Sequence, residues 1–428
     1  MTALVEVDEV ELSRLDDDRL LGFEIDRPRS ETEHPTYALP VRGWVLGRGD
    51  PVEAVEFVHD GAVLRTAAVA GKREDVAAAH PDVAGAKRSE FFAMISSLGL
   101  SRTFEVAVRA VLSDGARLQI GAIRGRRAPL QSQFEPHLAP LMLTSTGRVG
   151  STVLMNALGA HPQVVAYPPF QKEPRVASYW MTVFTTLSEP ASYVRQLAPG
   201  GPLHDGWWIG SGEPVPRASA NDEVERWMAV EAVESLAALC QGRIDALYRE
   251  IAASQGRTDA TYFAEKFRTD AIPALMWELY PGAREVVLVR DFRDVACSVL
   301  ASSAKRKGLA QRLDPRIVLD DIQSRTGSVV RAWRERSQRA HLVRYEDLIG
   351  QPAETLERLV AYLELDTAPN LVEAMVRALS EESAASERHR TTDAVETSIG
   401  RWRRDLNAEQ QREFGLALRE GLETFGYE

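Results

Sequence analysis

The sequence predicts an α/β protein in which a mostly parallel sheet is flanked by helices and preceded by a small all-β, sandwich-like domain. In the first part of the chain, alternating apolar runs meet at Asp60-Gly61 and again at Asp114-Gly115, and both pairs should take positive φ in tight hairpins. From residue 141 on, short apolar runs alternate with helical patterns, as in βα units. The length of 428 residues also exceeds what one hydrophobic core usually serves.

These patterns suggest domain boundaries. We expect residues 1–130 to form the β-sandwich-like domain and residues 136–428 to form the α/β domain, with a helical insertion at about residues 171–260. The segment RGRRAPLQSQFEPHLAP mixes charge, proline and glutamine, and we interpret it as a linker. The β-rich region contains no cluster of catalytic residue types. At the other end, NAEQQREFGLALREGLETFGYE predicts one amphipathic helix that begins at an Asn cap.

Composition narrows the functional classes. The formal net charge of −11 argues against nonspecific nucleic-acid binding, so we expect no nucleic-acid partner. No apolar run reaches the length of a membrane span, and the acidic N-terminal sequence lacks the pattern of a secretory signal. We therefore expect a cytoplasmic protein, and frequent Ala and Arg hint at a GC-rich bacterial genome. Cys240 and Cys297 give neither a disulfide framework nor a metal-site spacing, so no metal is expected.

The first candidate site is a strand-to-helix turn at residues 146–152. The run PLMLTS predicts a buried strand, TGRVGST a turn and TVLMNALGA a helix. Backbone N–H groups at a helix start, together with nearby hydroxyls, can bind an anion, and Gly147 and Gly150 allow close approach. The Gly-Lys-Ser/Thr ending of ATPase loops is absent, and the cation is Arg148 instead. A tight turn without a ligand is the alternative interpretation.

Three later segments carry cationic or aromatic residues, and in two of them these residues stand where strands should end. In REVVLVRDFRDVACSVLAS, Arg290 closes a strand and Ser298 lies eight residues later, on the next helix. Because an arginine and a hydroxyl above strand ends can hold a phosphate, this pair predicts a second anion site. HLVRYEDL places Tyr345 at another strand end, and SIGRWRRDL groups Arg401 with two further arginines around Trp402. Taken singly, each has a structural alternative: a surface salt bridge, a core aromatic or a solvated face.

Taken together and in this order, the segments resemble the sulfotransferase family that uses 3′-phosphoadenosine 5′-phosphosulfate (PAPS). STGRVGSTVL is similar to the family's 5′-phosphosulfate loop, and LVRDFRDVACSVLAS is similar to its 3′-phosphate motif. VRYEDL and SIGRWRRDL resemble two later segments, and YFAEKFRTD resembles a Glu-Lys element of the carbohydrate and tyrosylprotein branches. The resemblance covers about residues 140–428. It implies the P-loop-like sulfotransferase fold and a PAPS-dependent sulfotransferase that releases 3′-phosphoadenosine 5′-phosphate (PAP) and needs no metal.

The resemblance also implies roles for individual residues. Arg148 stands where the family contacts the transferred sulfonate, and Lys266 stands where a lysine assists the leaving group. The other implied donor-binding residues are Thr146, Gly147, Val149, Gly150, Ser151 and Thr152 in the 5′-phosphate loop, Arg290 and Ser298 at the 3′-phosphate, Tyr345 at the adenine, and Arg401 in a late basic loop. In-line attack by a hydroxyl on sulfur would then be assisted by these cations and by a general base.

The general base is where this sequence departs from the family pattern. Many members use a histidine, and the carbohydrate and tyrosine branches use a glutamate soon after the second strand, at a turn that has no Glu here. Glu173, in VVAYPPFQKEPRVASYW, is our leading candidate, and its structural alternative is a helix-start carboxylate. His204, in PLHDGWW, is the second candidate, with a plain loop histidine as its alternative.

The acceptor is less specified. The insertion at about residues 171–260 should form much of the acceptor wall. Its Trp207-Trp208 pair suits a sugar face or a fused ring, whereas we expect Trp227 in a helix core. We predict transfer to a hydroxyl of a glycan, a lipid-linked sugar or a secondary metabolite. The β domain could bind a glycan or a carrier, or mediate a homodimer.

Two other interpretations stay open. A P-loop phosphotransferase is disfavoured by the missing Gly-Lys-Ser/Thr. A noncatalytic binding protein with a degenerate α/β domain is disfavoured by the intact set of Arg148, Lys266, Arg290 and Ser298.

Overall fold

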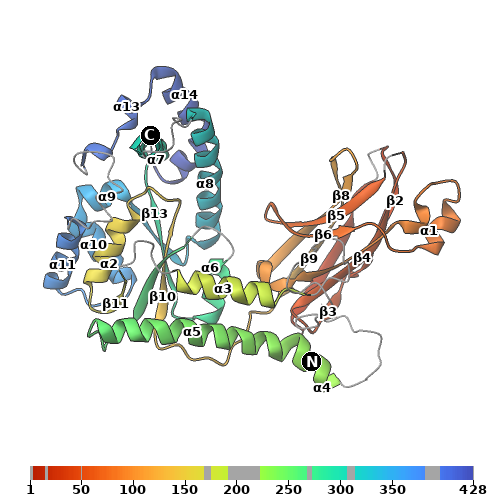
Figure 1. Cartoon of the computed structure of the whole chain (residues 1–428), viewed down its shortest axis with the longest axis horizontal. Helices are drawn as coiled ribbons and strands as arrows, with labels where there is room; N and C mark the ends of the chain where they lie inside the picture. Colours follow the sequence, from red (N-terminus) through yellow and green to blue (C-terminus); the bar gives the residue numbers. More distant parts are fainter. Residues whose placement is uncertain are drawn as a thin grey trace. The chain divides into compact units, whose positions relative to one another are not determined.

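The computed structural model describes residues 3–14, 18–49, 51–167, 175–190, 222–267, 272–305, 314–380 and 396–427. The chain divides into two compact units, which Figure 1 shows coloured along the sequence. The β unit comprises residues 1–134 and 181–240, and the α/β unit comprises residues 135–180 and 241–428. Each unit has a hydrophobic core of its own.

In the β unit, the described strands form two antiparallel sheets that share one core. One sheet has the order β3-β1-β9-β8-β5-β6 and the other has the order β2-β4-β7. The strands are β1 (Val5–Leu12), β2 (Leu20–Arg27), β3 (Thr32–His34), β4 (Ala38–Gly47), β5 (Val52–His59), β6 (Ala62–Ala68), β7 (Glu90–Ser96), β8 (Thr103–Leu112) and β9 (Arg117–Arg127). Along β8 every second residue is buried, as the two-residue period of a strand requires. The predicted antiparallel β region is confirmed.

The two Asp-Gly hairpins differ from each other. At the turn between β5 and β6, Asp60 (φ 49°) and Gly61 (φ 78°) both have positive φ, as expected for a two-residue turn. Between β8 and β9, only Gly115 (φ 82°) of the pair does. There the Leu112 amide donates to the Ala116 carbonyl, which leaves a longer loop, and the Asp114 carboxylate accepts from the Ala116 amide. The expectation of positive φ at both residues is wrong for this second hairpin.

In the α/β unit, the described strands form a parallel sheet with the order β11-β12-β10-β13-β14. Their bounds are β10 (Ala139–Ser145), β11 (Val164–Val165), β12 (Tyr262–Phe267), β13 (Arg284–Val289) and β14 (Ala340–Arg344). β11 and β12, which follow β10 in the chain, lie on one side of it, and β13 and β14 lie on the other side. Open α/β sheets bind ligands at such a reversal, outside the carboxyl ends of the strands. The predicted parallel sheet flanked by helices is confirmed, and it places a candidate site beside the ends of β10 and β13.

Helices cover both faces of this sheet, with α2, α9, α10 and α11 on one face and α8 on the other (Figure 1). The described helices are α1 (Glu74–Ala79), α2 (Ser151–Ala160), α3 (Val176–Leu187), α4 (Asp222–Arg226), α5 (Ala232–Ser254), α6 (Ile272–Leu279), α7 (Phe292–Lys305), α8 (Pro315–Arg336), α9 (Tyr345–Gly350), α10 (Pro352–Tyr362), α11 (Pro369–Ser380), α13 (Trp402–Asp405), α14 (Ala408–Ala417) and α15 (Arg419–Thr424). Within the described ranges, no helix is both long and apolar enough to cross a membrane.

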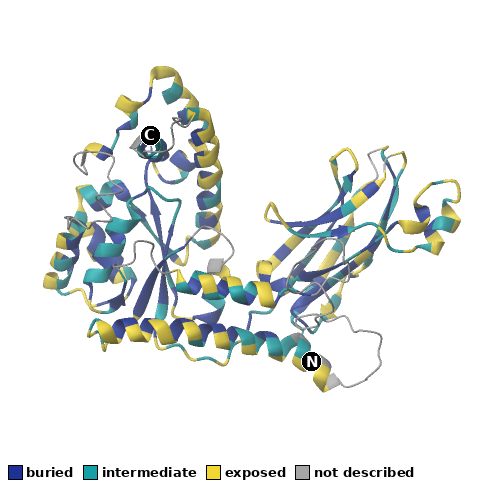
Figure 2. Ribbon diagram, viewed as in Figure 1, coloured by how far each residue is buried: buried dark blue, intermediate teal, exposed yellow. Residues whose placement is uncertain are grey.

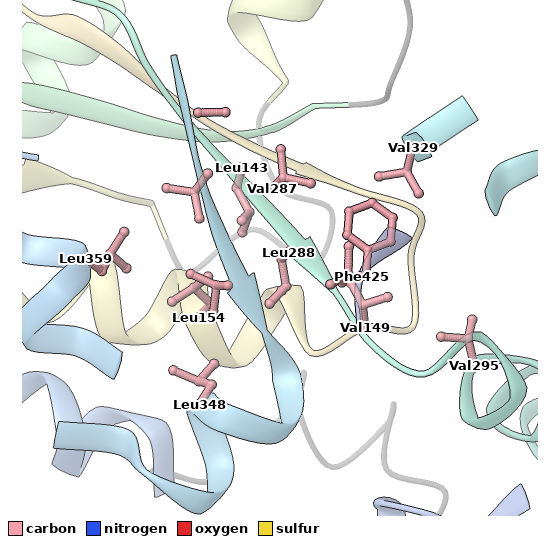
Figure 3. Close-up of a cluster of buried hydrophobic side chains, with 14 of the residues drawn as sticks. Leu143, Val149, Leu154, Val287, Leu288, Val295, Val329, Leu348, Leu359 and Phe425 are labelled. Carbon is pink, nitrogen blue, oxygen red and sulfur yellow. The ribbon is translucent and has the colours of Figure 1, made fainter. Parts of the chain in front are cut away.

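The core of the α/β unit holds the strand ends in place. Leu143 of β10 and Leu288 of β13 pack with Leu154 of α2 and Leu359 of α10, and all four are completely buried (Figure 3). Figure 2 shows the same division, with buried strands inside and exposed residues on the outward faces of the helices. Burying each such side chain contributes about 1.5–3 kcal/mol, so the strands form a rigid base for the loops that follow them.

Two local expectations differ from the structure. Asn407 caps α14 and forms a capping box with Gln410, as the sequence predicts, but the single C-terminal helix is broken. Leu418 (φ −101°, ψ 6°) leaves helical geometry, so α14 and α15 are separate. Trp227 is 52% exposed, so its expected place in a helix core is wrong. It begins a π-helical turn, which adds a residue and changes the face that each side chain occupies.

Candidate functional site

The loop between β10 and α2 has an unusual backbone. Gly147 (φ 84°), Arg148 (φ 60°) and Gly150 (φ 87°) take left-handed conformations. Glycine does this without strain, whereas Arg148 pays about 1–2 kcal/mol. Left-handed residues among ordinary ones turn backbone N–H groups toward a common hollow, which suits an anion. The side chain of Val149 lies in the hydrophobic core (Figure 3), so this residue offers a ligand only its backbone.

Tyr345 explains why residue 150 is glycine. A Cβ atom at Gly150 would lie 2.4 Å from Cδ2 and 2.5 Å from Cε2 of the Tyr345 ring. Tyr345 begins α9 at the carboxyl end of β14 and is 5% exposed. The Arg290 guanidinium lies 4.7 Å from the centre of the same ring. The tyrosine therefore ties the loop to the end of β13.

Arg148, Arg290 and Ser298 converge from three separate segments. The Arg148 side chain donates from Nε to Ser298 Oγ on α7 at 3.1 Å. Arg290, which follows β13, donates from Nη1 to the backbone carbonyl of Arg148 at 3.4 Å. Arg290 and Ser298 are 5% and 3% exposed. The structure thus brings together two predicted arginines and the predicted serine at the reversal of the strand order.

Lys266 lies on the other side of the same loop. It stands on β12 opposite Leu143 of β10, and its Nζ donates to Thr152 Oγ1 in the first turn of α2 at 3.0 Å. Ser151 is the first residue of α2. A lysine here places a second cation beside the helix N-terminus, where the helix dipole also favours negative charge.

A late loop completes the cluster. Arg401 is 6% exposed and forms an ion pair with Asp405, with Nη2 at 2.6 Å from Oδ2. Ser398, in the short turn before it, accepts from Arg290 Nη2 through its backbone carbonyl, and its hydroxyl lies 3.2 Å from the Tyr345 hydroxyl. Arginines from the ends of β10 and β13 and from this loop therefore lie in one cluster, in which Asp405 balances the charge of Arg401.

Some polar atoms of the site are left unsatisfied. Thr146 Oγ1 and Arg290 Nε are buried and have no hydrogen-bond partner in the described part of the chain. Because buried polar groups are nearly always paired, such atoms fit a ligand that supplies acceptors. An anionic, oxygen-rich ligand is compatible with this donor set.

Sequence reasoning missed two residues of the site, one beside the loop after β10 and one beside the late loop at Gly400–Trp402. Arg325 of α8 donates from Nη1 to the Thr146 carbonyl at 3.3 Å and is held by Asp321, with Nε 2.9 Å from Oδ1. As one arginine on a long polar helix, it gave no signal. Asp294 of α7 accepts hydrogen bonds from the amides of Gly400 and Trp402. Burial raises the pKa of Asp294 to about 6, and those amides partly offset the effect. In the sequence RDFRD it looks like any helix-start carboxylate, so no local pattern distinguishes it.

Glu265, beside Lys266, was also missed. It is 2% exposed and accepts hydrogen bonds from the Tyr248 hydroxyl and from the Ala177 amide in the first turn of α3, the latter at 2.8 Å. Burial raises the pKa of Glu265 to about 7, and the Tyr248 and backbone hydrogen bonds partly offset it. Strand β12 thus places the Lys266 cation at the start of α2 and the Glu265 carboxylate at the start of α3.

The two candidate bases are not placed. Glu173 and His204 lie outside the described residues, as do Trp207 and Trp208. Among the described residues, no group of three or more His, Cys, Asp or Glu side chains is arranged to hold a metal ion.

Comparisons with known proteins bear on the α/β part of the chain. Residues 140–369 match the Sulfotransferase family, and no curated protein matches the chain. The sulfotransferase domain of the Synechococcus PCC 7002 olefin synthase is 18% identical, with a TM-score of 0.41, and the match covers 70% of this chain and 99% of that one. Sulfotransferase STF9 from Mycobacterium avium is 17% identical, with a TM-score of 0.38 and coverages of 69% and 78%.

A mouse sulfotransferase, SULT7A1, was solved in complex with PAP; it is 12% identical, with a TM-score of 0.37 and coverages of 68% and 85%. The family match spans more than half of the 428 residues and includes the loop after β10, Lys266, Arg290, Ser298 and Tyr345. The chain belongs to the sulfotransferase family and is a sulfotransferase of class EC 2.8.2.

Proposed function

We propose that this sulfotransferase uses PAPS and transfers its sulfonate group to a hydroxyl of a glycan, a lipid-linked sugar or a secondary metabolite. The observation that supports this most strongly is the convergence of Arg148, Arg290 and Ser298 where the strand order reverses. PAPS carries a 5′-phosphosulfate and a 3′-phosphate. A site with cations on both sides of a left-handed loop has the charge to hold these two groups.

We assign the 5′-phosphosulfate to residues 146–152 and to Lys266, and the 3′-phosphate to Arg290, Ser298 and Arg401. The hydrogen bond from Lys266 to Thr152 supports the first assignment, because both groups stand at the start of α2. The burial of Arg290 and Ser298 supports the second, because a phosphate reaching them leaves water and gains stronger charge-assisted hydrogen bonds. We assign the adenine contact to Tyr345, whose ring packs against Gly150 of the loop and lies 4.7 Å from the Arg290 guanidinium.

The proposed step is an in-line transfer. The acceptor hydroxyl oxygen bonds to sulfur, the bond between sulfur and the bridging phosphate oxygen breaks, and PAP leaves. The hydroxyl proton passes to a base, and Arg148 and Lys266 meet the charge that develops on the sulfonate and bridging oxygens. Since the donor presents a sulfate rather than a γ-phosphate, no Mg²⁺ bridge is required, and we propose that transfer needs no metal.

Glu173 is our proposed base, and His204 is the second candidate. Within the family, we propose that the chain belongs to a carbohydrate- or tyrosylprotein-like branch. Residues 1–130 and 136–428 are the proposed domains, with acceptor recognition in the region 171–260. The contact of Glu265 with α3 supports a role for this helix in binding the sulfonate acceptor. The buried Glu265 carboxylate lies on β12, the strand that carries Lys266, and fixes the start of α3 beside the donor site.

Release of PAP from PAPS tests the function. The purified chain would be incubated with PAPS and with panels of glycans, lipid-linked sugars and hydroxylated secondary metabolites, with and without EDTA. We expect acceptor-dependent PAP release that EDTA leaves unchanged and that Arg148→Ala reduces by at least roughly a hundredfold, as for loss of a transition-state contact. Arg334→Ala, on the exposed face of α8 and paired with Glu420, is the matched control and should keep full activity. Mg²⁺-dependent turnover would contradict the proposal.

A further inference from the structure

Asp294 makes an unusual use of its carboxylate. It stands in the first turn of α7, where an acid commonly interacts with the N-terminus of its own helix. Instead, its Oδ2 accepts from the Gly400 amide at 2.7 Å and its Oδ1 accepts from the Trp402 amide at 2.9 Å. Both partners lie more than a hundred residues later in the chain. The carboxylate therefore grips the backbone of a distant loop on either side of Arg401.

The burial of this contact makes it consequential. Asp294 is 0% exposed, and a buried carboxylate is costly unless hydrogen bonds satisfy it. Gly400 has a φ of 66°, so the loop also takes a conformation that favours glycine at the gripped position.

Neighbouring residues dock the same loop. The Arg293 guanidinium lies 3.9 Å from the centre of the Trp402 ring and is itself held by Asp291, with Nη2 2.8 Å from Oδ2. Arg290 and Tyr345 contact Ser398 just before the loop. The residues that end β13 and begin α7 therefore supply both a proposed phosphate contact, Arg290, and the anchors of the loop that carries Arg401.

We propose that Asp294 is a positioning residue for the 3′-phosphate of the donor, which holds Gly400–Trp402 so that Arg401 faces the same phosphate as Arg290 and Ser298. This inference rests on the proposed PAPS site and adds a residue to it. Support comes from Arg290, whose Nη2 donates to the Ser398 carbonyl, three residues before Arg401. Asp405 accepts from Nε and Nη2 of Arg401, at 2.7 Å and 2.6 Å, and limits where this guanidinium can lie.

Two nucleotides that differ in the 3′-phosphate test the proposal. Titration calorimetry of the full chain would measure the Kd of PAP and of adenosine 5′-monophosphate. In Asp294→Asn, an isosteric amide keeps the volume but removes the charge and presents N–H groups to one of the two amides. We expect the Kd of PAP to rise roughly tenfold or more, since charge-assisted hydrogen bonds that hold the loop are lost. The Kd of adenosine 5′-monophosphate should change by less than about twofold, because that ligand does not use the loop.

A second variant changes the partner of Asp294 in the loop, Gly400. Gly400→Ala strains a left-handed residue and puts a Cβ 3.1 Å from Arg403 Nη1. It should produce the same selective loss even if Asp294→Asn folds poorly. Asp320→Asn, which removes an exposed acid from α8, is the control for a change in net charge and should leave both Kd values unchanged.

The outcomes separate two failures. Equal weakening of both nucleotides, or no weakening of either, in both variants would overturn the role of Asp294 while leaving the donor site in place. A wild-type chain that binds PAP no more tightly than adenosine 5′-monophosphate would overturn the proposed donor site itself, and this inference with it.

Discussion

Replacing Gly150 with alanine should destabilise the α/β unit by about 2–5 kcal/mol. The left-handed backbone at this position (φ 87°) costs an alanine about 1–2 kcal/mol. The new Cβ would lie 2.4 Å and 2.5 Å from two atoms of the buried Tyr345 ring, and overpacking of this kind costs about 1–3 kcal/mol more. Because Tyr345 also contacts Arg290 and Ser398 of the late loop, a displaced ring should disturb the anion site as well.

Denaturant unfolding of the full chain measures this cost, and Gly256→Ala is the matched control. Gly256 also has a positive φ (66°), but an added Cβ there meets no atom within 4 Å. It should therefore show only the backbone cost of about 1–2 kcal/mol. If Gly150→Ala were no more destabilising than Gly256→Ala, the packing of Tyr345 against the loop would not be what requires glycine at residue 150.

Three further predictions concern other parts of the α/β unit. Because folding raises the pKa of Glu265 from 4.5 to about 7, ionisation of this carboxyl lowers the free energy of unfolding as pH rises. Between pH 4.5 and pH 8, denaturant unfolding should show that the wild type loses about 3 kcal/mol of unfolding free energy relative to Glu265→Gln. Parallel pH profiles of the two proteins would contradict this. Ser298→Ala should weaken PAP binding about fivefold in calorimetry, because Arg148 loses an acceptor, whereas Ser303→Ala, whose hydroxyl bonds its own helix, should not. Asn407→Ala should lower the unfolding free energy by about 1 kcal/mol through loss of the capping box, and an unchanged denaturation midpoint would refute the cap.

Sequence reasoning found the parts of the site that obey local rules. The glycines of the loop after β10 indicated close approach of the backbone to a ligand, and the strand-to-helix pattern placed Arg290 at a strand end and Ser298 on the following helix. Parallel strands bring their carboxyl ends to one edge, so residues far apart in the chain could be grouped before any contact was known.

What the sequence could not show depends on long-range contacts. The cap that Glu265 provides for α3 joins residues 88 apart, and the grip of Asp294 on Gly400 spans 106. Neither has a local pattern, because a buried acid and a surface acid look alike in sequence. The predictions for the Asp114-Gly115 turn and for the burial of Trp227 were wrong for a related reason. The surrounding structure decides the length of a hairpin loop and the position of a π-helical turn.

The most direct measurement is titration calorimetry of the full chain with PAP in the absence of metal, for wild type, Arg290→Ala and Arg284→Ala. Arg284 begins the same strand at its other end and pairs with Glu364, so it matches Arg290 in residue type but not in position. We predict binding in the low-micromolar range or tighter for wild type and Arg284→Ala, and a loss of about 2 kcal/mol or more for Arg290→Ala, as for a lost charged hydrogen bond. Absent binding, or binding that Arg290→Ala leaves unchanged, would contradict a PAPS site at the ends of β10 and β13.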